Sequence, residues 1–142
     1  METVGRLLES KGGEIWSVGP EASVFDAIAL MAEKSCGALL VMDGARMAGI
    51  VSERDYARKV ILAGRSSKDT LVSDVMTSDV VSVEPGRSIE ECLSLMTDRR
   101  IRHLPVIDGE KVLGVVSIGD LVKAIVAEQR YLIAQLEQYI KQ

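Results

Sequence analysis

Two blocks of this chain, Gly49-Ile50-Val51-Ser52-Glu53-Arg54-Asp55 and Gly114-Val115-Val116-Ser117-Ile118-Gly119-Asp120, follow one pattern at an offset of 65 positions. The same offset extends the match without a gap, so that Ile15–Ile61 lies over Val80–Val126. Fourteen of the 47 aligned positions are identical, and many of the others exchange one apolar residue for another. Because a repeat at a fixed offset identifies the unit of folding, the sequence predicts two copies of one small α/β motif.

Each copy predicts the element order strand, helix, strand, strand, helix. A short apolar run ends at a proline, and the next helix starts at a serine with a carboxylate three residues later, which is a capping pattern. An Asp-Gly pair then joins two apolar runs into a hairpin, because glycine tolerates the positive φ of such a turn. In the first copy these elements are Ile15–Pro20, a helix from Ser23, strands Ala38–Met42 and Arg46–Ser52, and a helix at about Glu53–Ala63. In the second copy they are Val80–Pro85, a helix from Ser88, strands His103–Ile107 and Lys111–Ser117, and a helix at about Ile118–Glu128.

Further segments lie outside the two copies. Thr3–Leu8 is predicted to lead into the first copy, and Leu71–Met76 plays the same part before the second. The tail Arg130–Gln142 continues the helical pattern with an apolar stripe, which needs a cover from the body of the protein or from a second subunit. We therefore divide the chain into repeat 1 with its lead-in helix at residues 1–69, repeat 2 at 70–128, and a helical extension at 129–142. Each half alone buries too little surface, so we expect the halves to pack on each other.

Composition and charge exclude several classes of function. The formal net charge of −4 argues against non-specific nucleic-acid binding, which needs a clustered positive surface. We expect no membrane association, because no apolar run approaches the roughly 18–20 residues that span a bilayer and the first residues lack the apolar core of a signal peptide.

Cys36 and Cys92 are not at equivalent positions, and we interpret them as small core residues of a protein in the reducing cytoplasm. We expect neither an enzyme nor a metal site, because His103 is the sole histidine and neither a metal-ligand spacing nor a P-loop is present.

The two blocks, together with Arg102-His103-Leu104-Pro105-Val106, resemble tandem cystathionine β-synthase (CBS) domains, and the resemblance covers nearly the whole chain. It implies two β-α-β-β-α repeats packed with pseudo-twofold symmetry into one disc-like, Bateman-type α/β (α+β) module with two clefts. Clefts of this family commonly bind adenosine ligands. The chain is similar to small stand-alone prokaryotic members without a catalytic domain, which regulate a client protein and are usually homodimers.

The end of each block has residues suited to a nucleotide. Ser52 and Ser117 lie where a strand ends and a helix begins, and free amides together with the positive end of the helix dipole attract a phosphate there. The resemblance assigns hydrogen bonds from ribose hydroxyls to Asp55 and Asp120. The same Ser-x-x-Asp spacing is also that of a capping box, which stabilises a helix without any ligand.

The resemblance further implies that each cleft combines residues of both repeats. Around Asp120 we expect Ser117, Ile118 and Gly119 from one repeat, with Ile15, Trp16, Cys36 and Gly37 of the other around the adenine. Around Asp55 we expect Ser52 and Arg54, with Val80, Val81, Ile101 and His103. Trp16 is either an aromatic wall for the base or a large core side chain. Arg102 and His103 stand where the family often has cations that contact phosphate, a task that suits bidentate arginine. Arg99 and Arg100 are either part of this site or a solvated helix end.

The two blocks differ in chemistry, because Glu53-Arg54 stands in the first where Ile118-Gly119 stands in the second. We therefore expect one preferred nucleotide per chain. The expected ligand is AMP, followed by NAD(H), ADP and ATP, and the expected role is a regulatory module for energy or redox sensing. No G-x-G-x-x-G stretch is present, so a Rossmann-type NAD site is excluded. A ligand-free dimerisation scaffold is the alternative from a different class.

Overall fold

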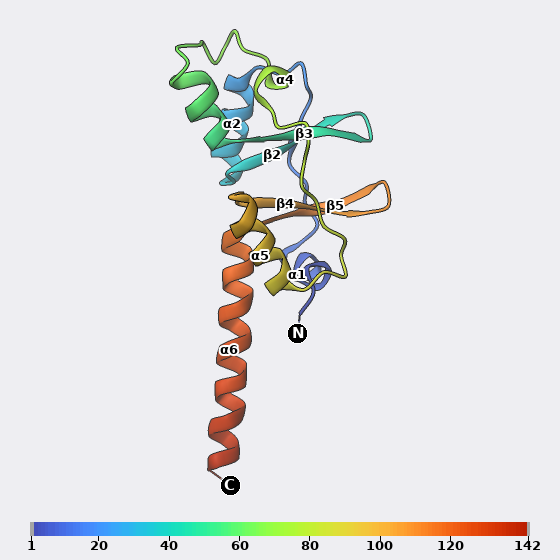
Figure 1. Cartoon of the computed structure of the whole chain (residues 1–142), viewed down its shortest axis with the longest axis vertical. Coiled ribbons are helices and arrows are strands. Elements are labelled where there is room, and N and C mark those ends of the chain that lie inside the picture. The colour runs from blue at the N-terminus through green and yellow to red at the C-terminus, as the bar shows by residue number, and fades with distance from the viewer. Residues whose placement is uncertain (1, 142) are drawn as a thin grey trace. The chain divides into compact units, whose positions relative to one another are not determined.

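The computed structural model describes residues 2–141, which fold into two compact units. The central unit is Glu14–Val81, and the terminal unit joins the chain before Glu14 to the chain after Val81. Each unit holds one of the two repeats, with helices packed on a small β-sheet (Figure 1). The predicted α/β class is therefore confirmed.

The central unit is built on a three-stranded sheet in the order β1-β2-β3. β1 pairs parallel with β2, and β2 pairs antiparallel with β3. Val24, Ala27 and Met31 recur at helical spacing on α2 and form one buried cluster with Leu39 and Val41 of the sheet. The elements of this unit are β1 (Ser17–Val18), α2 (Val24–Lys34), β2 (Ala38–Asp43), β3 (Arg46–Ser52), α3 (Glu53–Tyr56), η1 (Ala57–Ile61) and α4 (Val72–Val75).

The terminal unit repeats this plan around the β4–β5 hairpin. Ile89, Cys92 and Met96 of α5 are buried at the spacing seen in α2, as are Leu104 and Val116 of the two strands. Figure 1 shows α1, α5 and the start of α6 on one face of this hairpin. The elements are α1 (Val4–Lys11), α5 (Ile89–Arg99), β4 (His103–Asp108), β5 (Lys111–Ser117) and α6 (Ile118–Ile140).

Both predicted hairpins are confirmed in position, and they share one register. Each ladder shifts at the equivalent place, between Val41 and Met42 in the first hairpin and between Val106 and Ile107 in the second. The glycine of each Asp-Gly turn has a φ of 63°, which glycine adopts without a steric penalty. Identical turn chemistry thus sets identical pairing in the two copies.

The strands predicted at Ile15–Pro20 and Val80–Pro85 are shorter than expected. β1 covers only two residues, and the second copy keeps a single bridge between Val83 and Val106. Pro105 explains why the second copy pairs less. In the central unit the Leu40 N–H donates to the Trp16 carbonyl at 3.3 Å, whereas the residue 65 positions after Leu40 is Pro105, which has no N–H to donate.

The lead-in helix α1 packs on the second repeat, whereas the predicted division assigned it to repeat 1 at residues 1–69. The Val4 N–H donates to the Arg87 carbonyl at 2.9 Å, and the Gly5 N–H donates to the Pro85 carbonyl at 3.0 Å. Leu8 packs against Gly114 of β5. The N-terminal segment therefore completes the terminal unit.

Residues 70–81 complete the central unit in the same way. The Val72 N–H donates to the Ala22 carbonyl at 2.8 Å, and the Ser73 N–H donates to the Pro20 carbonyl at 3.0 Å. These two acceptors lie 65 positions before those that hold α1. The backbone hydrogen bonds carry no side-chain signal, and both lead-in segments also bury apolar side chains, so the sequence pattern does not show which repeat a lead-in segment joins.

Two helices also differ in form or length from the helices predicted from the sequence. The helix expected at Glu53–Ala63 is an α-helical turn followed by the π-helical turn η1, in which the Leu62 N–H donates to the Ala57 carbonyl at 3.0 Å. The helix expected at Ile118–Glu128 and the helical tail form one continuous helix that ends at Ile140. Gln142 lies outside the described residues.

We predict that Gly49→Ala destabilises the protein more than Gly114→Ala, although the two glycines are equivalent in the repeat. A Cβ at Gly49 would lie 2.6 Å from the backbone oxygen of Thr77. That oxygen accepts from the Ile50 N–H, and the Thr77 N–H donates to the Ile50 carbonyl, so the backbone of Thr77 is held in place. A Cβ at Gly114 would meet the Cδ2 atom of Leu8 at 2.9 Å, and the end of a side chain can rotate away. We expect a loss of about 1–3 kcal/mol for Gly49→Ala and less than about 1 kcal/mol for Gly114→Ala, measured by urea unfolding. Equal losses would contradict this account.

Candidate functional site

Both Ser-x-x-Asp motifs form complete capping boxes. The Ser52 N–H donates to Asp55 Oδ2 at 2.9 Å, and the Asp55 N–H donates to Ser52 Oγ at 3.2 Å. The corresponding distances at Ser117 and Asp120 are 2.8 Å and 3.1 Å. The capping interpretation of this motif is confirmed in both repeats, so any role in binding is additional to a structural one.

The capping boxes leave fewer amides for an anion than the sequence suggests. The Ile118 N–H donates to the Arg102 carbonyl at 2.9 Å, and the Asp120 N–H is bound by Ser117, so two of the first three amides of α6 are occupied. The Gly119 N–H has no acceptor within residues 2–141. A Cβ at Gly119 would meet only Ser117 Oγ, at 3.6 Å, so this side of the turn is open. The Glu53 N–H repeats the first of these contacts in the central unit by donating to the Gly37 carbonyl at 3.0 Å.

A lysine from α1 is paired with Asp120. Lys11 Nζ lies 2.7 Å from Asp120 Oδ2 and donates a second hydrogen bond to the Val115 carbonyl at 2.9 Å. Oδ2 therefore accepts from both Lys11 and the Ser117 N–H. Within the described chain, Oδ1 of Asp120 has no hydrogen-bond partner. One carboxylate oxygen holds the structure, and the other is available.

The carboxylate of Asp55 is more fully occupied. Its Oδ2 accepts from the N–H and the hydroxyl of Ser52, and its Oδ1 lies 3.1 Å from Lys59 Nζ. Lys59 also donates to the Val75 carbonyl at 2.8 Å. Both repeats thus use a lysine to bridge the capping carboxylate and a backbone carbonyl, but only Asp120 keeps an unused oxygen.

Electrostatics favour an ionised Asp120 beside an uncharged His103. Burial by itself raises the pKa of Asp120, but hydrogen bonds from Lys11 and Ser117 outweigh it and hold the pKa below its ordinary value. His103 pairs with Ser117 in the β4–β5 register and is half-buried. Burial, with the charges of Lys11 and Arg102, lowers the pKa of His103 against the opposing effect of Asp120. This environment disfavours the cationic form that the sequence analysis assigned to His103.

The predicted residues of the second repeat gather at the start of α6. Arg102 and His103 precede and open β4, and the hydrogen bond from Ile118 joins this corner to the Ser117–Asp120 turn. Ile101 is half-buried just before them, and Arg99, Arg100 and Arg102 are exposed. Arg100 has a φ of 55°, the left-handed conformation that ends α5. The terminal unit alone therefore brings an aspartate, a serine, a histidine, a lysine and an arginine to one helix start.

The predicted residues of the first repeat lie on the central unit. Trp16 packs against the core with Lys34 Nζ 4.3 Å from the centre of its ring, and Cys36 packs against the same core. Gly37 meets the start of α3, where Ser52, Arg54 and Asp55 lie. The remaining predicted residues of this unit are exposed or half-buried: Ile15, Val80 and Val81. The grouping of these residues with Asp120, and of Ile101 and His103 with Asp55, stays a prediction.

Sequence reasoning missed Lys11 and Lys59. Lys59 had a local signal, because it follows Asp55 by four residues and such pairs meet on a helix. Lys11 had none, since 109 positions separate it from Asp120. Among residues 2–141 no group of three or more His, Cys, Asp and Glu side chains is arranged to hold a metal ion. In the same part of the chain, no helix combines the length and apolar character needed to cross a membrane.

We predict that Lys11→Met raises the pKa of Asp120 towards its ordinary value. A pKa lowered by folding stabilises the native state above about pH 4, and this stabilisation is lost as the pH falls through the folded-state pKa. The variant should therefore be less stable than the parent at pH 7, by under about 1 kcal/mol because the pair is partly exposed. The difference should shrink as the pH falls through the folded-state pKa of Asp120. Carboxyl-carbon NMR titration and urea unfolding measure the two effects. Lys111→Met, at an exposed lysine of β5, is the control; an unchanged pKa of Asp120 in Lys11→Met would contradict the prediction.

Comparison with known proteins places these features in one family. A profile of the CBS domain matches the chain twice, at residues 12–61 and 72–127. The chain is 40% identical over 149 aligned residues to the CBS domain-containing protein CBSX3, mitochondrial, of Arabidopsis thaliana, which covers 98% of this chain and 72% of that protein. A solved protein with CBS domains from Burkholderia ambifaria is 55% identical with a TM-score of 0.86, over 89% of this chain and 96% of that one.

A more distant structure shares the fold alone. The CBS domain pair of protein MJ0100, solved in complex with 5′-methylthioadenosine and S-adenosyl-L-methionine, has a TM-score of 0.78 at 18% identity and covers 90% of this chain and 98% of that one. The two matched ranges coincide with the two sequence repeats, and the relatives align over most of the chain. The chain belongs to the CBS domain family and contains two CBS domains.

Proposed function

We propose that this chain is a regulatory module that binds an adenosine nucleotide, AMP in the first place, at the Ser117–Asp120 turn of the terminal unit. CBS domain pairs are in general regulatory and bind adenosine ligands, and the pair of protein MJ0100 was solved with two of them. The observation that carries the proposal is the unused Oδ1 of Asp120, an ionised acceptor beside an open amide. A module of this kind responds to ligand by changing its contacts with a client protein.

Each part of the nucleotide has a candidate partner. The ribose hydroxyls would donate to Asp120 Oδ1, and the phosphate would accept from the Gly119 N–H and from the Ser117 hydroxyl, with the exposed Arg102 as the nearby cation. The absence of a side chain at Gly119 leaves room for a larger ligand, so ADP, ATP and NAD(H) are the next candidates. Asp55 has no equivalent unused oxygen, which supports one preferred site per chain.

The competing function is a scaffold that binds no nucleotide. The complete capping boxes support it, because they account for both Ser-x-x-Asp motifs by helix stability alone. They use only Oδ2 of Asp120 and leave Oδ1 able to accept from a ligand, which is the feature that favours the nucleotide site over the scaffold.

Buried Cys92 agrees with the proposed reducing location in the cytoplasm, although the relative CBSX3 is named as mitochondrial.

We predict that AMP raises the melting temperature and that Asp120→Asn weakens AMP binding about tenfold or more. Ligand at 100 times its Kd stabilises the folded state by about 2.7 kcal/mol. Loss of a charged acceptor for a ribose hydroxyl removes about 1.5–3 kcal/mol of binding free energy. ADP, ATP, NADH and S-adenosylmethionine complete the panel, and calorimetry gives the affinities.

Asp55→Asn is the matched control and should change AMP affinity less than threefold. No thermal shift with any nucleotide would favour the scaffold. An unchanged affinity in Asp120→Asn would place the nucleotide away from this turn.

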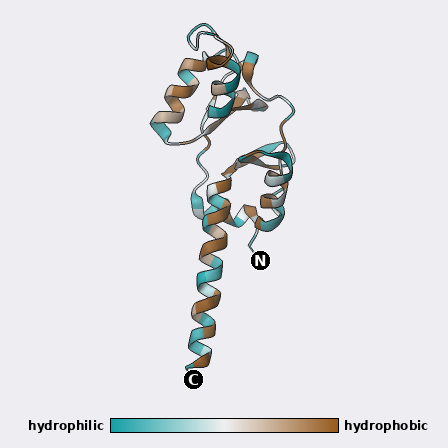
Figure 2. Ribbon diagram, turned by 60° about the vertical axis from the view of Figure 1, so that its left-hand side comes forward, coloured by the Kyte–Doolittle hydropathy of each residue, from teal (hydrophilic) through white to brown (hydrophobic). Residues whose placement is uncertain are grey.

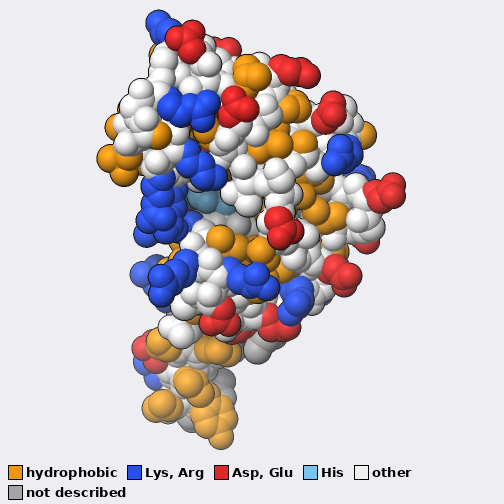
Figure 3. Space-filling view, turned by 45° about the horizontal axis from the view of Figure 1, so that its top comes forward, with side chains coloured by type: hydrophobic (Ala, Val, Ile, Leu, Met, Phe, Trp, Pro, Cys, Tyr) orange, Lys and Arg blue, Asp and Glu red, His pale blue; other side chains and the backbone are white. Residues whose placement is uncertain are grey.

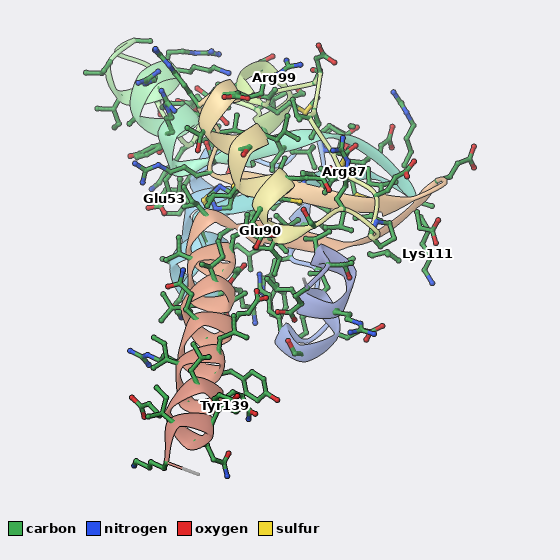
Figure 4. The ribbon with its side chains drawn as sticks, turned by 60° about the horizontal axis from the view of Figure 1, so that its bottom comes forward. Glu53, Arg87, Glu90, Arg99, Lys111 and Tyr139 are labelled. Carbon is green, nitrogen blue, oxygen red and sulfur yellow. The ribbon has the colours of Figure 1, made fainter. Side chains whose placement is uncertain are left out.

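We further propose that the chain forms a homodimer through α6. Val126, Ile133, Leu136 and Ile140 are exposed and recur at spacings of seven, three and four, the pattern of a helix that packs against another helix. Figure 2 shows brown segments along the length of α6, and Figure 3 shows hydrophobic side chains at its far end. Tyr139 projects from the same end of the helix (Figure 4). A second copy presents the same apolar stripe, as an isologous dimer requires.

We predict that the double variant Ile133→Glu, Leu136→Glu is monomeric while the parent is dimeric. The two side chains are 55% and 62% exposed, so the substitutions should leave the fold intact. Gln135→Glu with Gln138→Glu adds the same charge to exposed polar positions of the same turns and should remain dimeric. Light scattering after size-exclusion chromatography measures the mass. A dimer that persists in the first variant would show that α6 does not form the interface.

A further inference from the structure

Lys11 carries a hydrogen-bond donor that the fold does not use. An ammonium group has three N–H donors. Two of them bind Asp120 Oδ2 at 2.7 Å and the Val115 carbonyl at 2.9 Å, and the described residues offer no third acceptor. The side chain of Lys11 is 42% exposed, so the third donor is open to solvent.

The position of this donor is set by packed structure. Lys11 ends α1, which is held at its start by backbone hydrogen bonds to Pro85 and Arg87 and in its middle by Leu8 against Gly114. The Gly12 N–H closes the last turn by donating to the Leu8 carbonyl at 3.0 Å. The ammonium group is therefore presented beside Asp120 by a docked helix.

The ion pair offers a donor and an acceptor side by side. The donor is the third N–H of Lys11, and the acceptor is Oδ1 of Asp120, on the same carboxylate that Lys11 contacts through Oδ2. A vicinal diol matches this arrangement, because one hydroxyl donates to a carboxylate oxygen while the oxygen of its neighbour accepts from an ammonium. A ribose with free 2′ and 3′ hydroxyls presents such a diol.

We infer that Lys11 is a specificity-determining residue, which together with Asp120 recognises the 2′,3′-diol of a ribonucleotide. The inference rests on the proposed nucleotide site and adds a second residue and a selectivity to it. A site that binds a hydroxyl through dedicated polar groups rejects analogues that lack it, because those groups are left unpaired. The module should therefore distinguish AMP from its 2′-deoxy and 3′-deoxy analogues.

The central unit supplies a natural control. Lys59 also bridges a capping aspartate and a backbone carbonyl, but it contacts Oδ1 of Asp55 at 3.1 Å while Oδ2 is bound by Ser52. Each oxygen of Asp55 already has a partner in the chain, so this second lysine–aspartate pair offers a diol no carboxylate oxygen as open as Oδ1 of Asp120. Lys59→Met removes the same charge from the chain without touching the Lys11 pair.

The test compares the affinities of the full chain and its variants for AMP, 2′-deoxy-AMP and 3′-deoxy-AMP by calorimetry. We expect the parent and Lys59→Met to bind AMP at least tenfold more tightly than either analogue. In Lys11→Met we expect AMP affinity to fall about tenfold and the preference for AMP to fall below threefold. Circular dichroism confirms that each variant is folded, and Lys11→Arg, which keeps the charge and the donors, should recover part of the preference.

Three outcomes overturn the inference, and each identifies a different step that has failed. If the parent binds AMP and Lys11→Met keeps the tenfold preference, Lys11 acts by charge or by docking α1, and the diol role is wrong. If the parent binds AMP and both deoxy analogues equally, the site does not recognise the diol. If the parent binds no nucleotide at all, the proposed function fails, and this inference fails with it.

Discussion

The carboxylate of Asp120 ties three parts of the terminal unit together. It closes the first turn of α6 through Ser117, it receives the ammonium group of Lys11 from α1, and through Lys11 it is linked to the Val115 carbonyl of β5. All of these contacts use a single oxygen. Because the neighbouring positive charge and the amide lower its pKa, the carboxylate stays ionised near neutral pH, and its other oxygen remains a strong acceptor.

A structural role and a binding role are therefore compatible at this motif. A capping box and a ligand compete only when they need the same lone pairs, and at Asp120 the internal contacts converge on Oδ2. At Asp55 they are spread over both oxygens, because Lys59 follows it on the same helical segment and approaches Oδ1. The origin of each lysine, from a distant helix or from the next turn, makes the two duplicated turns chemically different.

Divergence between the copies also acts through the backbone. Pro105 stands where the first copy has Leu40, and the lost N–H reduces a parallel strand pair to one bridge. Gly119 stands where the first copy has Arg54, and it leaves the start of α6 open. Single substitutions on a shared framework thus concentrate the candidate chemistry in the terminal unit.

The sequence by itself determined the repeat, both hairpins, the capping serines and the family, because these depend on local spacing and turn chemistry that recur at a fixed offset. It also placed Ser117 and Asp120 at a helix start. Only the tertiary structure decided that α1 joins the second repeat, since its backbone hydrogen bonds leave no trace in the sequence and its buried apolar side chains resemble those of the other lead-in segment. The same docking brings Lys11 to Asp120 across 109 positions, and no periodic pattern records a contact between a single lysine and a single aspartate so far apart.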